Sequence, residues 1–489
     1  MTPREKIAHL LRRFGLGATQ ADLDRLEPLG VDATLNWLID YEKTDEGFPL
    51  IPWEFCHEDG KEEIYVDPYR FATYWSVRLA ISQRPLEQRL CVFWHNHFAV
   101  SGTKVEFGPM MLAYLEAIRR NAAGPFPKLL QAVSREPAMI KYLDTDTSLK
   151  GHPNENFARE LLELFTMGQG NYTEKDIQEA SRAFTGWGIR YVLFENGGDK
   201  VQERIRTSML SNTPMVAYSF SPDLHDDEPK TVLGKTATFS GEDLLAYVGM
   251  HHETASHITA KLWRFFASDT LPESTHQDLI RVYEENGGNT RAVLREIARQ
   301  DAFWADTTVR RQVKSPVDFV VPIVRQLGLQ TYVLASRGTN KPDPMKRAPK
   351  PVMDVAGIVW FMMTKQGMSL FFPPNVGGWE WGQAWITSAN MFERTNLANL
   401  LFGVGQPDKG LAGYFGQTIL ATNPTDDRAC VDRFLTTFDA NLPEAKRLLL
   451  VKAFTDAGGK SALATPEGSS KALAAIGQLV FGSPEFQLC

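Results

Sequence analysis

Apolar residues recur every three to four positions along most of the chain, which is the period of an α-helix with one buried face. In the N-terminal part this spacing predicts helices at residues 3–14, 19–26, 31–39, 67–82, 86–98, 108–122 and 126–134. Two further helices carry signals at both ends. Pro153 and Asn154 open the first, which Gly168 closes, and Thr173 caps the second, which Gly186 ends.

The period changes between residues 188 and 239. β-branched and aromatic residues alternate with polar ones there, in IRYVLFEN, MVAYSF and KTVLGKTATF, and this alternation predicts short strands. Helical spacing then resumes and predicts helices at 241–249, 253–267, 274–285, 290–300, 315–327, 352–364, 391–403, 426–437, 442–456 and 468–479. A basic, Pro-rich loop is expected at 335–350.

The predicted fold is therefore mainly α, with a large multi-helical body and a small antiparallel β insertion. Three regions follow from the pattern. Residues 1–187 form an N-terminal helical region with His, Glu and Arg motifs, 188–239 form the β insertion, and 240–489 form a C-terminal helical region with a Trp-rich loop.

Composition excludes several classes of protein. Of 489 residues, 43% are hydrophobic and 23% are charged, which is enough apolar material for a large core. The 52 basic and 59 acidic residues give a net charge of −7 without a basic stripe, so nucleic acid is not an expected partner. No apolar run reaches the roughly eighteen residues of a transmembrane segment.

Motifs for common cofactors and for export are missing. The four cysteines form no CxxC or CxxCH, which argues against a zinc ribbon, a disulfide framework and covalent haem. GxGxxG is absent and the GKT at 234–236 lacks the glycine of a phosphate loop, so no nucleotide is expected. The amphipathic N-terminus has no signal-peptide core, which predicts a cytoplasmic location unless a partner exports the chain.

Two histidines, His95 and His97, lie in the apolar run FWHNHFAVS. If the helix continues through them, their side chains point about 200° apart and cannot chelate one ion. If the chain turns at Trp94, both can face one side, and the aromatic neighbours would dry a metal or proton-transfer site. The alternative is a helix end at which histidine is favoured by the dipole.

The helix that Asn154 opens carries Glu155, Arg159, Glu160 and Glu163. Glu155, Arg159 and Glu163 lie within about 80° on a helical wheel, opposite an apolar face. One interpretation is a solvated ladder of ion pairs four residues apart. The other is a carboxylate-rich face that supplies metal ligands, as in helical-bundle metal sites.

Further polar candidates lie outside this helix. His225 and Asp226 stand in an acidic loop of the β insertion, and His beside carboxylates suits a divalent ion. Arg182 and Arg394 occupy otherwise apolar helices. Because a buried arginine usually has a carboxylate partner, the three glutamates of the helix after Asn154 are their expected partners.

The segment PPNVGGWEWGQAW concentrates aromatic residues on a loop. Two prolines stiffen it and two glycines permit a tight bend. Trp379, Trp381 and Trp385 either fill the core or form a stacking platform for a ligand, together with Asn375.

Taken together, these segments resemble a bacterial family known as domain of unknown function 1800. The resemblance rests on HLLRRFGLGAT (9–19), FWHNHFAVS (93–101), EPAMIKYLDT (136–145), NENFARELLELFTMGQGNYTEKDIQEASRAFTGW (154–187), LHDDEPKTVLG (224–234), KLWRFF (261–266) and FFPPNVGGWEWGQAWI (371–386). It runs through almost the whole chain. Family members often carry export signals and are encoded beside a sulfatase-like family, so the resemblance implies a sulfatase-like protein as a partner.

The resemblance also implies a set of polar and aromatic positions, called the family pattern below. Its members are His95, His97, Asn154, Glu155, Arg159, Glu160, Glu163, Arg182, Gly186, Trp187, His225, Asp226, Asn375, Gly378, Trp379 and Arg394. Exposed charges can usually be exchanged at little cost in stability, so a polar pattern of this kind favours a converging, partly buried centre.

The leading hypothesis is a metal-dependent enzyme of hydrolase type. A divalent ion (zinc, manganese or iron) would be held by His95, His97, Glu160, Glu163, His225 and Asp226, in some combination. Glu155 would act as base on the activated water. Arg159, Arg182 and Arg394 would orient an anionic group, and the Trp379 loop, with Asn375, would line the pocket of a small-molecule, glycan or peptide ligand.

The second hypothesis belongs to another class, a non-catalytic binding or assembly protein. The polar positions would then form a buried His/Glu/Arg network that fixes the fold, and the tryptophans would form a surface for a partner or a glycan. The two hypotheses differ in geometry. A catalytic centre gathers at least three ligating groups around an open position, whereas a structural network leaves its groups paired and sealed.

Overall fold

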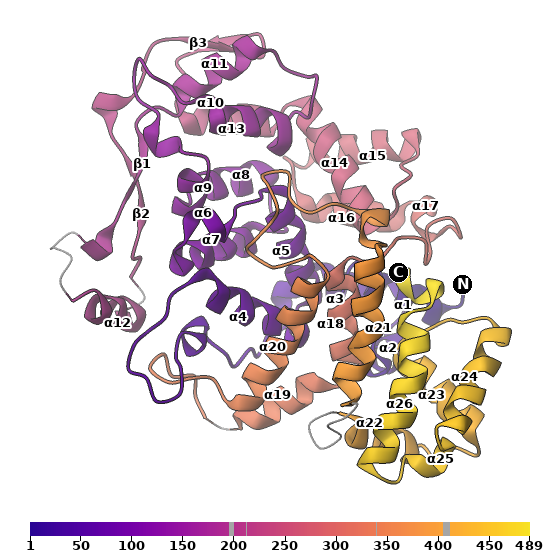
Figure 1. Cartoon of the computed structure of the whole chain (residues 1–489). Coiled ribbons are helices and arrows are strands. Elements are labelled where there is room, and N and C mark those ends of the chain that lie inside the picture. Colours follow the sequence, from indigo (N-terminus) through magenta and orange to yellow (C-terminus); the bar gives the residue numbers. More distant parts are fainter. Residues whose placement is uncertain (195–199, 212, 339, 404–410) are drawn as a thin grey trace.

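The computed structural model describes residues 1–194, 200–211, 213–338, 340–403 and 411–489. Within these residues the chain folds into 26 α-helices and two antiparallel sheets of two strands each (Figure 1). The predicted mainly α fold is confirmed. None of the helices in these ranges combines the length and apolar character that a bilayer crossing requires.

The N-terminal part holds eleven of these helices. They are α1 (Pro3–Arg13), α2 (Gln20–Leu26), α3 (Val31–Ile39), α4 (Pro68–Ile81), α5 (Pro85–His97), α6 (Gly102–Val105), α7 (Gly108–Asn121), α8 (Phe126–Ser134), α9 (Pro137–Tyr142), α10 (Glu155–Glu160) and α11 (Glu174–Ala183). The caps that the sequence indicates are present. Asn154 accepts a hydrogen bond from the backbone of Asn156, and Thr173 forms a capping box with Asp176.

Helix α5 is the buried centre of this part of the molecule. All thirteen of its residues are buried, because α4 and α7 pack against it and cover it (Figure 1). A helix that is covered on every side has no solvated face. His95 and His97 therefore lie in the interior, where a polar ring is unfavourable unless its nitrogens have hydrogen-bond partners.

The middle of the chain continues the helical body. It contains α13 (Gly241–Gly249), α14 (His252–Phe266), α15 (Glu273–Glu285), α16 (Thr290–Arg299), α17 (Asp301–Trp304), α18 (Pro316–Gln326), α19 (Leu329–Arg337) and α20 (Lys350–Lys365). Helices α18 and α20 return to pack on α4, so segments more than 230 residues apart share one core.

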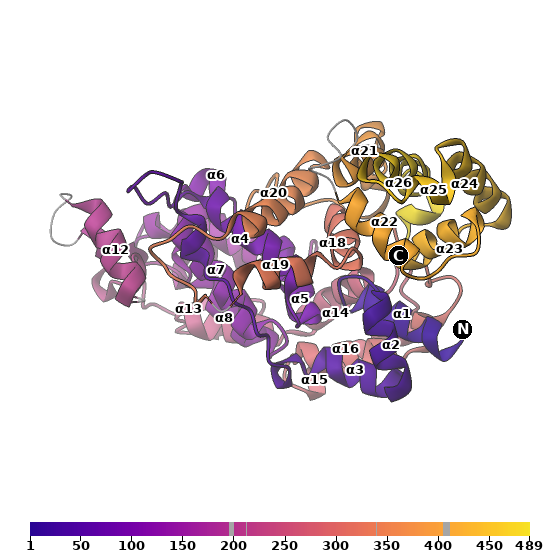
Figure 2. The same cartoon turned by 90° about the horizontal axis from the view of Figure 1, so that it is seen from below.

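A bundle around α26 (Pro466–Phe481) forms one end of the molecule (Figures 1 and 2). Its other helices are α21 (Ser388–Phe402), α22 (Ala412–Leu420), α23 (Asp427–Thr437), α24 (Glu444–Asp456) and α25 (Gly459–Ala462). Helices α21, α22 and α24 each pack directly on α26. Phenylalanine rings fill the space between them; Phe434, for example, lies 4.7 Å from Phe438 between ring centroids.

The β insertion differs from the prediction in detail. Strands β1 (Trp187–Arg190) and β2 (Ala217–Phe220) pair in one sheet, and β3 (Lys230–Val232) and β4 (Lys235–Ala237) form a separate hairpin. An unpredicted helix, α12 (Val201–Ser211), lies between β1 and β2 along the chain. Its buried Ile205 and Met209 are four residues apart, a helical spacing that the surrounding β-formers masked. Residues 195–196, the end of the predicted strand IRYVLFEN, lie outside the described residues.

Arg394 ties distant segments together in the core. Its side chain is fully buried, and its three guanidinium nitrogens donate to Gln366 Oε1 (2.9 Å), Gln487 Oε1 (2.8 Å) and the Lys314 carbonyl (2.8 Å). The guanidinium also lies 4.8 Å from the ring centroid of Phe319. The expected carboxylate partner on α10 was wrong: neutral oxygens from three other segments take its place.

Arg394→Met should lower the free energy of unfolding by about 3 kcal/mol, because three buried acceptors lose their donors. Arg299→Met is the matched control, since the Arg299 side chain is 73% exposed; it should change stability by less than about 0.5 kcal/mol. Equilibrium urea unfolding of both variants measures the difference. Equal, small losses would contradict a structural role for Arg394.

Candidate functional site

His95 lies inside a box of aromatic rings. Its ring centroid is 5.2 Å from Trp75, 5.4 Å from Trp379, 5.6 Å from Phe371 and 6.0 Å from Tyr114. Neither ring nitrogen has a hydrogen-bond partner among the described residues. Burial lowers the pKa of His95 to about 3, so the ring is neutral at ordinary pH.

His97 faces another part of the core. Helix α5 continues to His97, so the two rings point to different neighbours, as two residues on one helix must. His97 Nε2 lies 3.1 Å from the Phe165 carbonyl, which can only accept, so the ring donates there. Burial lowers the pKa of His97 well below its usual value. The two histidines do not share a coordination site.

The acceptor of His97 belongs to a π-helical turn. Helix α10 widens at Leu161–Phe165, and such turns leave carbonyls without their normal helical donors. Three side chains supply donors instead. His97 bonds the Phe165 carbonyl, His257 Nε2 lies 3.3 Å from the Leu164 carbonyl, and Thr166 Oγ1 donates to the Leu161 carbonyl at 2.6 Å. The buried imidazoles thus hold the end of this helix.

The charged face of α10 is largely an ion-pair ladder. Arg159 bonds Glu155 at 3.2 Å and Glu174 of α11 at 2.9 Å, and its side chain is 37% exposed. Glu163 accepts from Gln169 (2.7 Å) and Tyr172 (2.9 Å). Glu163, one of the predicted metal ligands, therefore already accepts hydrogen bonds from two neutral donors.

Glu160 is the exception on this face. It is half-buried and has neither a hydrogen bond nor an ion pair among the described residues. Burial, and next the charge of Glu163, raise the pKa of Glu160. Across the described ranges no group of three or more His, Cys, Asp and Glu side chains lies close enough together to hold a metal ion. The predicted ligand set is therefore not brought together within these ranges.

Arg182 and the loop at 225–226 form a separate cluster. Arg182 donates to both carboxylate oxygens of Asp226, at 2.8 and 3.1 Å, and also to Glu179. His225 Nδ1 donates to the Thr185 carbonyl at 2.9 Å. The expected partner of Arg182 on α10 was wrong, because the acidic loop folds back and supplies Asp226 instead. This fork geometry fastens the loop to α11.

The Trp-rich loop packs into the body. Trp379 and Trp385 are 4% and 7% exposed, and Trp381 is half-buried with its edge on Phe265. The Trp379 backbone N–H donates to Asn96 Oδ1 at 2.6 Å. At Gly378 a Cβ would lie 2.2 Å from that same oxygen, so only glycine fits there.

Exposed Asn375 plays a local part in the Trp-rich loop. Its side-chain oxygen accepts from the Gly377 backbone and shapes the turn. Trp379 fills the core beside His95 of α5, and Trp381 packs on Phe265 of α14.

Lys261 is an interior cation that the sequence reasoning missed. It lies on α14 one turn after His257, is half-buried, and has no carboxylate partner among the described residues. Burial lowers the pKa of Lys261 to about 8. The signal was present in KLWRFF, since a lysine four residues after a buried histidine lies on the same helical face.

A comparison of sequence families agrees with the motifs. A family model described as a protein of unknown function (DUF1800) matches residues 9–488, which is almost the entire chain. No curated protein and no solved structure is significantly similar to the chain.

Acid should destabilise the protein through its buried histidines. His95 has a pKa of about 3 when folded and an ordinary value near 6.5 when unfolded. The unfolded chain therefore binds more protons between these values, and stability is lost as the pH falls from about 7 toward 3. His95→Phe, which keeps a ring in the aromatic box, should fold and reduce this slope by up to about one proton.

Urea unfolding between pH 4.5 and 7.5 measures the slope. Exposed His152 offers a control, and His152→Phe should leave the slope unchanged. A His95→Phe protein that kept the full slope would contradict the lowered pKa of His95 as its cause. One that failed to fold would show that the ring nitrogens of His95 have a structural role that phenylalanine cannot replace.

Proposed function

Because this chain belongs to the DUF1800 family, we propose that the family pattern braces the helical fold and that the protein acts as a non-catalytic binding protein. The observation that carries this proposal is the pairing of Arg394, Arg182 and His97 within the fold, although His95 and Glu160 have no partner among the described residues. Arg394 bonds neutral oxygens, Arg182 grips Asp226, and His97 holds the Phe165 carbonyl. A catalytic centre would leave such groups converging on an open position.

The binding surface that we propose is an apolar groove between α19, α20, α21 and α22. It encloses about 470 Å³, within the usual size of ligand pockets. Three large side chains in its lining stay exposed: Tyr332 (51%), Tyr414 (59%) and Leu400 (42%). Val355, Ile358, Leu329, Leu401 and Leu411 form its apolar walls, and Asp354 is its charged lining residue.

The occupant that we propose is an apolar segment of a partner polypeptide. Tyrosine combines a large apolar ring with a polar hydroxyl, which suits a surface that is wet when free and buried when bound. Exposed tyrosines around an apolar floor are typical of the centres of protein interfaces. In Figure 1, α19 and α22 lie in the lower part of the molecule, and in Figure 2, which views it from below, both are turned toward the viewer.

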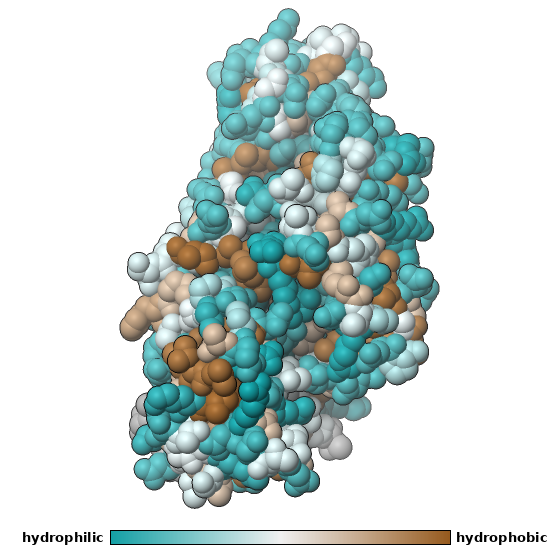
Figure 3. Space-filling view, turned by 90° about the vertical axis from the view of Figure 1, so that its right-hand side faces the viewer, coloured by the Kyte–Doolittle hydropathy of each residue, from teal (hydrophilic) through white to brown (hydrophobic). Residues whose placement is uncertain are grey.

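A second set of exposed apolar side chains provides the comparison. Leu448 and Leu449 of α24 are 55% and 64% exposed, and neither lines the groove. Figure 3 shows hydrophobic colour gathered near the lower end of the face that it presents. Exposed leucines alone do not define a binding site, so a change at these two positions serves as a matched control.

The neutral dye Nile red tests the groove. The double variant Tyr332→Ser/Leu400→Ser should bind the dye at least about tenfold more weakly, because the apolar contacts that it removes are worth over about 1.4 kcal/mol. Leu448→Ser/Leu449→Ser should bind like the wild type. Fluorescence titration gives the dissociation constants. Equal affinity in the two double variants would contradict the groove as the apolar site.

Displayed peptides test the kind of occupant. A library of random peptides is selected on the wild-type protein and counter-selected on Tyr332→Ser/Leu400→Ser. We expect enrichment of peptides with Leu, Phe or Trp at helical or alternating spacing. Dye binding without any peptide enrichment would contradict a polypeptide as the occupant and would favour a small apolar molecule as the ligand.

A further inference from the structure

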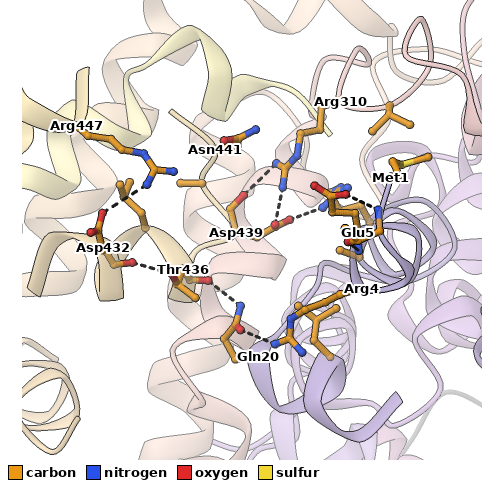
Figure 4. Close-up of a pocket in the computed structure, with 17 residues that line it drawn as sticks. Met1, Arg4, Glu5, Gln20, Arg310, Asp432, Thr436, Asp439, Asn441 and Arg447 are labelled. Atoms are coloured by element: carbon orange, nitrogen blue, oxygen red, sulfur yellow. Dashed lines mark hydrogen bonds and ion pairs between the residues drawn. The ribbon is translucent and has the colours of Figure 1, made fainter. Parts of the chain in front are cut away.

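An open cavity of about 430 Å³ lies where the two ends of the chain meet. Helices α1 and α2 form one wall, and the segment that includes the end of α23 and the start of α24 forms the other (Figure 4). Four arginines line it: Arg4, Arg12, Arg310 and Arg447. Three carboxylates, Glu5, Asp432 and Asp439, also line it. Arg4 is paired with Asp24 and Glu27, and Arg447 with Asp432, whereas Arg12 and Arg310 share one carboxylate, so the excess of positive charge lies at these two arginines.

The arginine pair of HLLRRFGLGAT explains how α1 contributes. Neighbouring residues on a helix point about 100° apart. Arg13 turns inward, is fully buried and donates to the carbonyls of Phe265 (2.7 Å) and Phe266 (3.1 Å). Arg12 turns to the cavity, where it is 7% exposed and donates to Asp439 at 2.8 Å. Arg13 therefore fixes the fold, and Arg12 is presented to the cavity.

One carboxylate serves two guanidinium groups in this cavity. Arg310 donates to the Asp439 side chain at 2.5 Å and to its carbonyl at 3.0 Å, while Arg12 holds the other carboxylate oxygen. Arg12 Nε is buried and has no partner among the described residues. Because a buried cation and an unpaired buried donor are both costly, this arrangement has unused capacity for an anion.

The backbone positions of this pair are strained. Arg310 has φ +53° and Asp439 has φ +51°, in the left-handed region that residues with a Cβ rarely adopt. Such backbone conformations are unfavourable for residues with a Cβ, and the surrounding fold must offset them. Two such residues that bond to each other across the cavity are typical of a site in which side-chain position matters.

A further cation stands behind Asp439. Lys314 lines a small enclosed space of about 20 Å³ that shares Arg12, Arg310 and Asp439 with the cavity. Its Nζ lies 3.8 Å from the ring centroid of Phe486 and has no carboxylate partner among the described residues. Lys314 therefore adds positive potential at the inner end of the cavity.

We propose that this cavity binds a small polar molecule through its carboxylate or phosphate group, held between Arg12 and Arg310 with Arg447 at the rim. Guanidinium forks match both oxyanions and bond them through two donors. The cavity is larger than one oxyanion. Asn441 and the Thr436 hydroxyl, which can still accept, supply polar groups for the rest of the ligand (Figure 4). This site is separate from the apolar groove and does not rest on the function proposed for it.

Isothermal titration with inorganic phosphate and with succinate tests the site on the full chain. We expect saturable binding of at least one of them at a single site, and the stronger probe identifies the oxyanion. Arg447→Gln, at a position 32% exposed, should weaken binding at least about threefold without loss of folding. Asp439→Asn should tighten it several-fold, since the internal competitor for the arginines loses its charge.

Arg295→Gln is the matched control. Arg295 also pairs with an aspartate, Asp40 at 2.7 Å, and lines a different cavity, so this change should leave the dissociation constant unaltered. Absence of saturable binding to the wild type would overturn the proposal, and so would equal losses in Arg447→Gln and Arg295→Gln. If Asp439→Asn does not fold, the dissociation constants of Arg447→Gln and Arg295→Gln alone test whether the anion binds in this cavity. Nile red affinity should be unchanged in Arg447→Gln, which separates this site from the groove.

Discussion

The constraint on which this fold depends is the pairing of carbonyl groups at buried helix ends. Every helix ends with carbonyls that lack intrahelical donors, and in a body built from many helices a large share of these ends are interior. Interior side chains supply the donors. Arg13 bonds the end of α14, Arg325 bonds the carbonyls of Ala80 and Ser82 at the end of α4, and His97 bonds the π-turn after α10.

This constraint accounts for polar residues that look catalytic in the sequence. A buried arginine has five N–H donors in a fixed fork, so it can donate hydrogen bonds to several carbonyl groups at once. A neutral imidazole can do the same for one carbonyl without bringing a charge into the core, which the lowered pKa of His97 favours. In this account, binding takes place where the structure leaves groups open, in the apolar groove and in the arginine-lined cavity.

Local features of the fold could be predicted from the sequence, and long-range ones could not. Helices such as α8 and α13 follow the predicted bounds because spacing and caps are local signals. The ladder between Glu155 and Arg159 was also one of the predicted interpretations, since it needs only the geometry of one helix. Helix α12 was not predicted because β-forming residues surround it. Helix α19 (Leu329–Arg337) was not predicted either, and its last residues occupy the first positions of the loop predicted at 335–350.

The hydrogen-bond partners of Arg182 and Arg394 were the main feature that the sequence did not predict. Arg394 bonds Gln487, 93 residues away, and Arg182 bonds Asp226, 44 residues away. Each arginine had nearer carboxylates in the sequence, and only the folded topology decides which group it meets. The same reason explains why the cavity around Arg12 and Arg310 was not foreseen: its lining comes from three segments that are far apart in the sequence.

The most direct test of a structural role for the family pattern is the free energy of unfolding with and without metal. The native protein is unfolded in urea after treatment with EDTA, and again with zinc, manganese or iron(II) in excess. The account predicts the same unfolding free energy in every case. An increase of about 1.4 kcal/mol or more with one ion, as expected for a site saturated at about ten times its dissociation constant, would contradict it.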